Sequence, residues 1–297
     1  MQSQHSAYLF TGLTILFWGG AASAFKLALA WVTPFTLLAY SCLISFLFLL
    51  ALLVVQGKLG EIARMSPKDM RRALLLGMLN PFLYYIVLFK AYSLLPGQIA
   101  MSLNYGWPLV LTLLSVPILG QSLSRSQLAA VAVSFLGAIV IATKGELTSF
   151  GGVSGFGLIL AAASTLIWAV FWLVNARSSQ DPVLQLFLGF GAALVCVILA
   201  VPLFGGIERP PLQAILPLVY VGLFEMGLTF VLWLSALKRA TSAASIGNLI
   251  YCTPFLSLLF LHLIVGEAIH SATFIGLVLI VASLLFQEWQ RAKKLPK

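Results

Sequence analysis

Asparagine and aromatic side chains recur at helical spacing inside the apolar segments of this sequence. Asn80 and Tyr84 are four residues apart, and Asn104 and Trp107 are three apart. The pattern returns in two more places, the pair Asn248 and Tyr251 and the stripe of Ser164, Trp168, Trp172 and Asn175. Residues at these spacings share one face of a helix. A face that combines aromatic surface with amide groups suits a molecule with an apolar side chain and a zwitterionic head.

The amide groups also have a structural interpretation, because asparagine often joins membrane helices through interhelical hydrogen bonds. We favour the binding role for Asn80 and Asn104, and we leave both interpretations open for Asn248.

Three tryptophans, Trp18, Trp107 and Trp168, fall near the middle of apolar segments. Tryptophan is normally enriched at membrane interfaces, where its N–H reaches water. An indole N–H deep in a membrane needs a polar partner, which a wet cavity or a polar ligand can supply. Ordinary packing between helices explains the same positions, so the cavity and packing interpretations both stay open.

Glu225 is the carboxylate that lies well inside an apolar segment. A carboxylate in lipid is costly and marks a candidate functional site. Three roles stay open for it. It could exchange a proton for substrate, pair with a substrate ammonium group, or stay neutral and form a hydrogen bond with a neighbouring helix.

The other reactive side chains indicate no catalytic or metal centre. Cys42, Cys196 and Cys252 lie in apolar runs, where cysteine acts as a small packing residue. The histidines do not combine with Cys, Asp or Glu at metal-ligand spacing. We therefore expect no cofactor and no bound metal. Glu267, at the end of an apolar run, is assigned a structural role, as a helix-terminus or cap group and not as a substrate ligand.

The composition restricts the class of protein that must position these residues. The chain has 297 residues, of which 61% are hydrophobic and only 8% are charged, against about 25% charged in an average globular domain. So few charges cannot cover the surface of a soluble protein. Soluble enzymes, disordered proteins and nucleic-acid modules are excluded, despite a net charge of +9.

The sequence predicts an all-α integral membrane protein with ten transmembrane helices. Barrel strands are excluded because the apolar runs lack alternation and are about twice strand length. The predicted helices cover about 7–25, 33–55, 72–90, 98–118, 126–143, 154–175, 183–203, 212–234, 242–264 and 271–289. The first is a genuine helix and not a signal peptide, because no Lys or Arg precedes it.

The distribution of basic residues predicts cytoplasmic N- and C-termini in a multi-pass protein of the inner (plasma) membrane. With the N-terminus inside, 13 of the 17 Lys and Arg residues fall on the cytoplasmic side. The opposite side holds three, Lys26, Lys144 and Arg209. This asymmetry follows the positive-inside rule, so the net charge reflects topology and does not indicate nucleic-acid binding.

An internal repeat divides the chain into two halves, 1–145 and 150–297, each with five helices. Tyr105 matches Tyr251 and Pro108 matches Pro254 at an offset of 146. Further matches are Asn80 with Glu225, Gly77 with Gly222, Trp18 with Trp168 and Pro34 with Pro182. Because five is odd, the halves enter the membrane from opposite sides, as in the inverted repeats of transporters.

The repeat also suggests how two of these pairs act. Trp18 and Trp168 would face each other across the pseudo-two-fold axis. Pro108 and Pro254 would introduce matched kinks, about which helices could tilt to open and close a central cavity. A static bend that makes room for packing is the alternative.

The chain resembles the drug/metabolite transporter superfamily, in its ten-helix EamA-type branch. This resemblance rests on Phe17-Trp18-Gly19, the proline-containing fourth and ninth helices, and Gly266-Glu267. Within that branch, Asn104-Tyr105-x-Trp107-Pro108 followed by Gly120-Gln121 is similar to the YddG amino-acid exporters. The resemblance implies a central cavity among helices 1, 3, 4, 6, 8 and 9 and export of aromatic and other neutral amino acids by alternating access.

The expected partners are therefore amino-acid substrates and the lipid bilayer, with no nucleic acid; whether the chain forms a homo-oligomer stays open. The rival from another class is a polytopic membrane enzyme, which would need paired acids, a His cluster or a basic phosphate site. A proton-coupled multidrug exporter would depend on Glu225. A nucleotide-sugar carrier would need buried Lys or Arg residues, which are nearly absent from the apolar segments.

Overall fold

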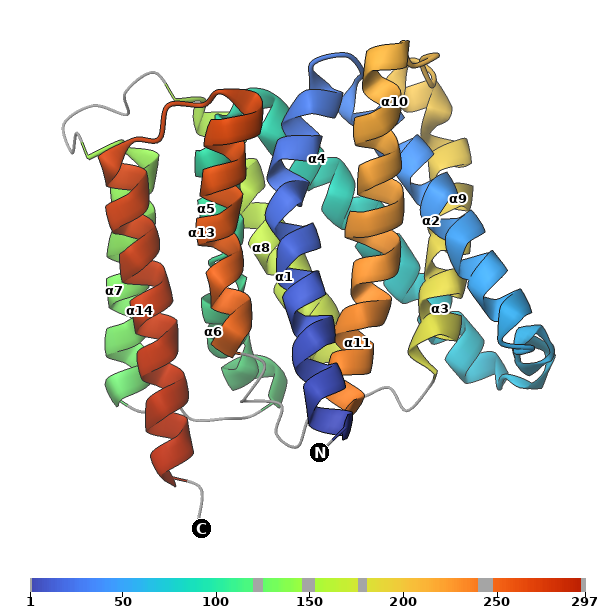
Figure 1. The fold of residues 1–297 in the computed structure, drawn as a ribbon, viewed down its shortest axis with the longest axis horizontal. Coiled ribbons are helices and arrows are strands. Elements are labelled where there is room, and N and C mark those ends of the chain that lie inside the picture. Colours follow the sequence, from blue (N-terminus) through green and yellow to red (C-terminus); the bar gives the residue numbers. More distant parts are fainter. Residues whose placement is uncertain (1, 120–124, 146–152, 176–180, 240–247, 295–297) are drawn as a thin grey trace.

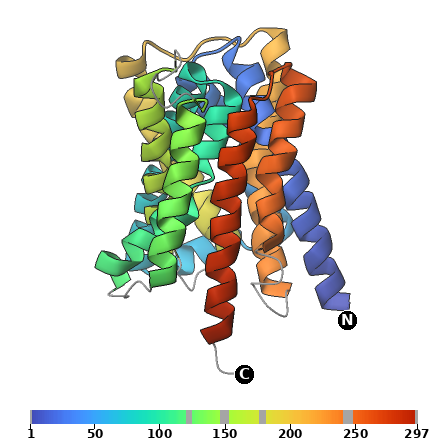
Figure 2. The same ribbon diagram turned by 90° about the vertical axis from the view of Figure 1, so that its left-hand side faces the viewer.

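The computed structural model describes residues 2–119, 125–145, 153–175, 181–239 and 248–294. Within these ranges the secondary structure is helical, with no strand. Most helices run roughly along one common direction, and the N- and C-termini lie at the same end of the molecule (Figures 1 and 2). We call this the terminal end and the other the distal end.

Within the described residues, the predicted apolar segments coincide with helical structure. The first half consists of α1 (Gln2–Leu29), α2 (Pro34–Val55), η1 (Leu59–Arg64), α3 (Pro67–Gly77), η2 (Met78–Leu83), α4 (Tyr84–Leu94), α5 (Gly97–Asn104), α6 (Trp107–Leu119) and α7 (Arg125–Ala142). The second consists of α8 (Gly155–Asn175), α9 (Pro182–Phe204), α10 (Leu212–Val219), η3 (Tyr220–Leu228), α11 (Thr229–Arg239), η4 (Asn248–Cys252), α13 (Thr253–Phe260), η5 (Leu261–Val265) and α14 (Ser271–Lys294).

Several of these helices are long and apolar enough to cross a membrane. Five segments qualify by length and composition among the described residues: Gln4–Leu29, Pro34–Val55, Pro67–Leu94, Pro182–Phe204 and Leu212–Ala236. Shorter apolar helices cover Leu128–Ile141, Gly155–Phe171, Leu249–Val265 and Ser271–Phe286. The chain is therefore a multi-pass membrane protein, and the count of ten membrane crossings stays a prediction.

Helix starts follow from a short polar side chain placed before a proline. Thr33, Ser66 and Asp181 each accept a hydrogen bond from a backbone N–H in the first turn of α2, α3 and α9. In all three cases the next residue is a proline. Proline suits the first turn because it has no backbone N–H, and an N–H at that position would have no helical partner. Pro34 and Pro182, matched in the sequence repeat, thus begin equivalent helices.

Several of the predicted helices are interrupted, and the ninth changes from the 3-10 segment η4 through α13 to the π-helical η5. The third changes from α3 through the π-helical η2 to α4, and the eighth contains the π-helical η3. The fourth is divided into α5 and α6 by a turn at Tyr105 and Gly106. Asn80 and Glu225, matched in the repeat, lie in the η2 and η3 interruptions.

Glycines allow the two halves to contact each other closely. A Cβ atom added at Gly77 in α3 would collide with the backbone of Gly189 in α9. Its repeat partner Gly222 in η3 has equally little room, against Ile44 and the Ser41 carbonyl of α2. Each matched glycine therefore packs against the second helix of the opposite half.

The last helices of the two halves, α7 and α14, lie side by side at one edge of the molecule (Figures 1 and 2). Gly137 and Gly276 bring their backbones together, and the hydroxyls of Ser134 and Ser283 form a hydrogen bond. The pair shares small residues at its contact, as closely packed membrane helices do.

Candidate functional site

A cluster of aromatic and polar side chains joins α4, α5 and α8. The rings of Tyr84 and Trp168 are 4.5 Å apart between centroids and inclined by 34°. The Tyr84 hydroxyl donates to Oδ1 of Asn104 at 3.2 Å, and Nδ2 of Asn104 donates to the Ser164 hydroxyl at 2.9 Å. We call Tyr84, Asn104, Ser164 and Trp168 the central cluster.

The central cluster combines apolar surface with satisfied polar groups. Tyr84 and Trp168 are buried, and Asn104 is half-buried. Asn104 uses both its acceptor and one of its donors, so its orientation is fixed by two neighbouring helices. This arrangement agrees with a binding surface and equally with interhelical bonding, the two roles that the sequence left open for Asn104.

Trp18 and Trp168 approach the same ring, Phe230 in α11. The centroid distances to Phe230 are 5.7 Å from Trp18 and 5.8 Å from Trp168, both with the edge-to-face geometry that aromatic rings favour. The two tryptophans thus flank Phe230, which the sequence analysis did not single out. Trp18 also contacts Trp233, with their ring centroids 6.2 Å apart.

The helical spacing used for Asn80 was wrong, because the chain leaves the helix at this residue. Asn80 has φ −144° and ψ 116°, an extended conformation between α3 and α4. A residue before proline avoids the helical region, and Pro81 follows here. Asn80 and Tyr84 therefore cannot be placed on one face by a spacing of four. Asn80 is buried, and its Oδ1 has no hydrogen-bond partner among the described residues.

Trp107 and the two repeat-related prolines occupy helix starts, which corrects two expectations. Trp107 is the first residue of α6 and not the middle of a continuous helix. Pro108 is the second residue of α6, and Pro254 is the second residue of α13. A proline in a first turn removes no helical hydrogen bond. The interruptions precede these prolines, so neither proline kinks a continuous helix.

The remaining sequence candidates pack against the hydrophobic core or lie outside the described side chains. Tyr251 in η4 and Trp107 are half-buried and pack against the core. The side chains of Pro108, Trp172, Asn175 and Asn248 fall outside the described residues, as do Gly120 and Gln121 entirely.

Glu225 is buried in η3, with 8% of its surface exposed. Its Oε1 accepts a hydrogen bond from the Tyr85 hydroxyl at 3.1 Å, and its Oε2 has no partner among the described residues. Tyr85 was not predicted from sequence, because it lies 140 positions from Glu225 and no helical periodicity links the two residues.

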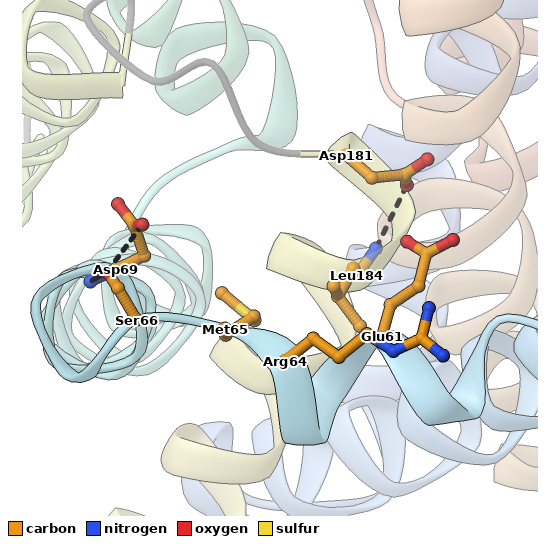
Figure 3. A pocket seen from close by; sticks show the side chains of 7 residues that line it. All are labelled: Glu61, Arg64, Met65, Ser66, Asp69, Asp181 and Leu184. Carbon is orange, nitrogen blue, oxygen red and sulfur yellow. Dashed lines mark hydrogen bonds between the residues drawn. The ribbon is translucent and has the colours of Figure 1, made fainter.

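A surface cavity of about 410 Å³ lies beside η1 and the start of α9, away from the central cluster. Glu61, Arg64, Asp69 and Asp181 supply its charges (Figure 3). Asp181 forms an ion pair with Lys58, with Nζ and Oδ2 2.6 Å apart. Burial raises the pKa of Asp181, but the bonds from Lys58 and from the backbone N–H groups of Leu184 and Val183 outweigh it and lower the pKa below 3.8.

Comparisons with known proteins agree with the helical architecture. An "Uncharacterized transporter" of Archaeoglobus fulgidus is 26% identical over 282 residues, covering 93% of this chain and 95% of the relative. The "Aromatic amino acid exporter YddG" of Ancylobacter novellus is 29% identical over 207 residues, covering 67% of this chain and 70% of the relative. A solved crystal structure superimposes on this chain with a TM-score of 0.67. It is 25% identical in sequence, and the match covers 98% of this chain and 100% of the solved chain.

A family model gives the broadest match. The model described as the EamA-like transporter family matches residues 5–143 and again residues 155–287. These two matches cover most of the chain and correspond to its two sets of helices. This chain therefore belongs to the EamA-like transporter family.

Proposed function

We propose that this protein exports neutral amino acids, including aromatic ones, across the inner membrane by alternating access. The observation that carries this proposal is the close contact between the inclined rings of Tyr84 and Trp168, next to the fixed amide of Asn104. Aromatic rings of this kind hold an apolar or aromatic side chain, and the amide and hydroxyl groups suit the polar head. The exporter named in the comparison from Ancylobacter novellus supports the same substrate class.

The alternating-access part of the proposal is supported by matched features of the two halves. Asn80 and Glu225 lie in corresponding interruptions, and Gly77 and Gly222 make corresponding contacts with the opposite half. Interrupted helices at a repeat interface are typical of transporter binding sites. In this proposal the halves form an inverted repeat, and Trp18, Tyr84, Trp107 and Trp168 face the substrate path.

The orientation follows from the charge distribution. The terminal end carries both termini and the η1 segment (Figure 1). The basic residues that flank η1, among them Lys58, Lys68 and Arg71, favour the cytoplasm for this end. Export then moves substrate from the terminal end to the distal end.

Counterflow in proteoliposomes tests the function. Purified protein is reconstituted, loaded with unlabelled substrate and supplied with labelled amino acids, cationic drugs or nucleotide sugars outside. We expect uptake of labelled phenylalanine, tryptophan and other neutral amino acids, and background uptake in protein-free liposomes. Background uptake of every amino acid would refute the proposal.

A proton-coupled exporter of cationic drugs is the second candidate, favoured by the buried carboxyl group of Glu225. It predicts drug counterflow without amino-acid counterflow and flux driven by a pH gradient. Replacing Glu225 with Gln would abolish that pH-driven flux. If a proton gradient drives no flux in the parent protein, this candidate fails.

A further inference from the structure

The surroundings of Glu225 do not satisfy its carboxyl group. A carboxylate offers about four acceptor positions, and one described donor, the Tyr85 hydroxyl, reaches it. The partners of Glu225 among the described residues include no cation, and the Lys58–Asp181 ion pair lies outside η3. A buried charge without a partner is strongly unfavourable. The free oxygen Oε2 therefore requires a cation or a proton that these parts of the chain do not provide.

The backbone that carries Glu225 is held firmly. The Ser45 hydroxyl of α2 donates to the carbonyl oxygen of Gly222 at 2.6 Å, and Gly227 packs against Phe48. Two residues of η3 on either side of Glu225 are thus fixed on α2, while the Glu225 side chain reaches Tyr85 on α4. The unpaired oxygen is held in place by these contacts from two helices.

Glu225 is connected to the central cluster through two adjacent rings. Tyr85 packs edge-to-face on Tyr84, with centroids 4.8 Å apart, and the Tyr84 ring in turn contacts the ring of Trp168 at an incline. A cation beside these rings gains a further attraction to their faces. A second buried and unpartnered acceptor, Oδ1 of Asn80, lies in the segment immediately before these tyrosines. Glu225 thus offers an unpaired acceptor next to aromatic rings, as an ammonium group requires.

We propose that the carboxylate of Glu225, positioned by Tyr85, binds the ammonium group of the substrate. This inference rests on the proposed amino-acid transport and specifies how its substrates are selected. Primary amines that carry an aromatic side chain satisfy both Glu225 and the rings. A substrate that retains the carboxylate and lacks the amine leaves Oε2 unpaired and brings a second negative charge toward it.

Binding of three related compounds to the purified full chain tests the proposal. Phenylalanine carries both charged groups, phenethylamine carries only the amine, and 3-phenylpropionate carries only the carboxylate. Calorimetry on the parent should show phenethylamine bound at least about tenfold more tightly than 3-phenylpropionate, since a charge-assisted bond to a buried group is lost in the latter. Equal affinities for the two analogues would overturn the proposal.

Glu225→Gln removes the charge and retains an acceptor for Tyr85. We expect it to weaken phenethylamine and phenylalanine binding about tenfold or more, with 3-phenylpropionate binding unchanged or tighter. The matched control, Glu61→Gln at an exposed position, should leave all three affinities unchanged. Unchanged phenethylamine affinity in Glu225→Gln would refute the role of Glu225.

Two further measurements separate this inference from folding and from the proposed function. Tyr85→Phe leaves Glu225 in place and removes its anchor, so it should weaken amine binding less than Glu225→Gln does; an equal or larger loss would contradict the assignment. The calorimetric binding measurement does not require transport. If amino-acid counterflow is absent, the proposed transport function is refuted, but the ammonium site is not. Loss of amine selectivity in Glu225→Gln would still support the ammonium site.

Discussion

The carboxylate of Glu267 accepts a hydrogen bond from the backbone N–H of Gly97 at 2.7 Å. Its second oxygen accepts from the next backbone N–H, that of Gln98, at 3.1 Å. These N–H groups belong to the first turn of α5, where a helix leaves its donors unpaired and favours negative charge. The capping role assigned to Glu267 from sequence is confirmed, and the capped helix belongs to the opposite half.

The Glu267 contact belongs to a larger connection between the halves at the distal end. The Gln98 side chain donates to the carbonyl of Ala268 and accepts from the backbone N–H of His270. Nearby, within the first half, Lys26 at the end of α1 donates to the carbonyls of Tyr92 in α4 and of Leu95, the residue after α4. Opening the distal end by separating α5 from the segment before α14 must break the bonds to Glu267 and Gln98.

Replacing Glu267 with Ala should therefore lower the free energy of unfolding by about 1–2 kcal/mol, the usual cost of a lost helix cap. Glu267→Gln retains an acceptor without the charge and should lose roughly half as much. Thermal unfolding in detergent measures both, with Glu61→Ala as an exposed control. Equal stability of Glu267→Ala and the parent would show that the cap contributes nothing.

Trp168→Ala should reduce counterflow of aromatic amino acids more than that of small neutral ones. Loss of one ring–ring contact corresponds to about 0.5–1.5 kcal/mol, or roughly 2- to 12-fold in apparent affinity. Trp168→Phe retains an aromatic ring, so its counterflow of aromatic amino acids should fall less than that of Trp168→Ala. Trp289→Ala, at an exposed tryptophan of α14, provides the control. An identical substrate profile in Trp168→Ala and the parent would remove Trp168 from the site.

The bond between Tyr84 and Asn104 should appear as a coupling energy. Asn104→Leu leaves the buried Tyr84 hydroxyl without its acceptor, at a cost of about 1–3 kcal/mol. In a Tyr84→Phe background that hydroxyl is absent, so the same substitution should cost about 1 kcal/mol less. A double-mutant cycle of unfolding free energies measures the difference. Additive effects would mean that the bond does not stabilise the fold.

The Lys58–Asp181 pair should give a defined pH dependence of stability. The hydrogen bond to Asp181 raises the pKa of Lys58 above 10.5, and the net pKa of Asp181 lies below 3.8. The lowered pKa of Asp181 stabilises the fold above pH 3.8, and this contribution is lost as the pH falls through the folded-state pKa. The raised pKa of Lys58 stabilises the fold below pH 10.5, and this contribution is lost as the pH rises through its folded-state pKa.

Asp181→Asn retains the helix cap and removes the charge. Because both groups are partly exposed, the free energy of unfolding of the parent should exceed that of Asp181→Asn by only about 0.2–1 kcal/mol between pH 5 and pH 9. The difference should be lost as the pH falls below 3.8 and through the lowered pKa of Asp181, and it should shrink in high salt. Chemical unfolding across this pH range measures it, and a difference independent of pH would exclude the ion pair as its source.

The sequence predicted the helical segments well because apolar length decides them, and lipid leaves helices as the way to satisfy the backbone. It failed where a helix is interrupted. Both breaks carried a usable local signal: Pro81 follows Asn80, and Gly106 and Pro108 flank Trp107. The Tyr85–Glu225 bond joins residues 140 positions apart, and no periodicity within one helix can pair them. The contacts between the two halves were therefore not predictable from sequence patterns and became visible only in the structure.

Gly77 offers the sharpest test of how the halves pack. A Cβ at this position would meet the carbonyl of Gly189, which is backbone and cannot move aside as a flexible side chain can. Ala is otherwise the better helix former, by about 1 kcal/mol. Gly12 in α1 is also helical, and a Cβ there would meet nothing within 4 Å. Gly12→Ala should therefore leave stability unchanged or raise it by up to about 1 kcal/mol.

Gly77→Ala should lower stability by about 1–3 kcal/mol, the usual cost of overpacking, because α3 and α9 must separate. If the movement between α3 and α9 is part of transport, counterflow by Gly77→Ala should fall even at temperatures where the variant stays folded. Thermal unfolding and counterflow measured on the same preparations separate the two effects. Equal stability of the Gly77 and Gly12 variants would show that the close crossing does not exist in the folded protein.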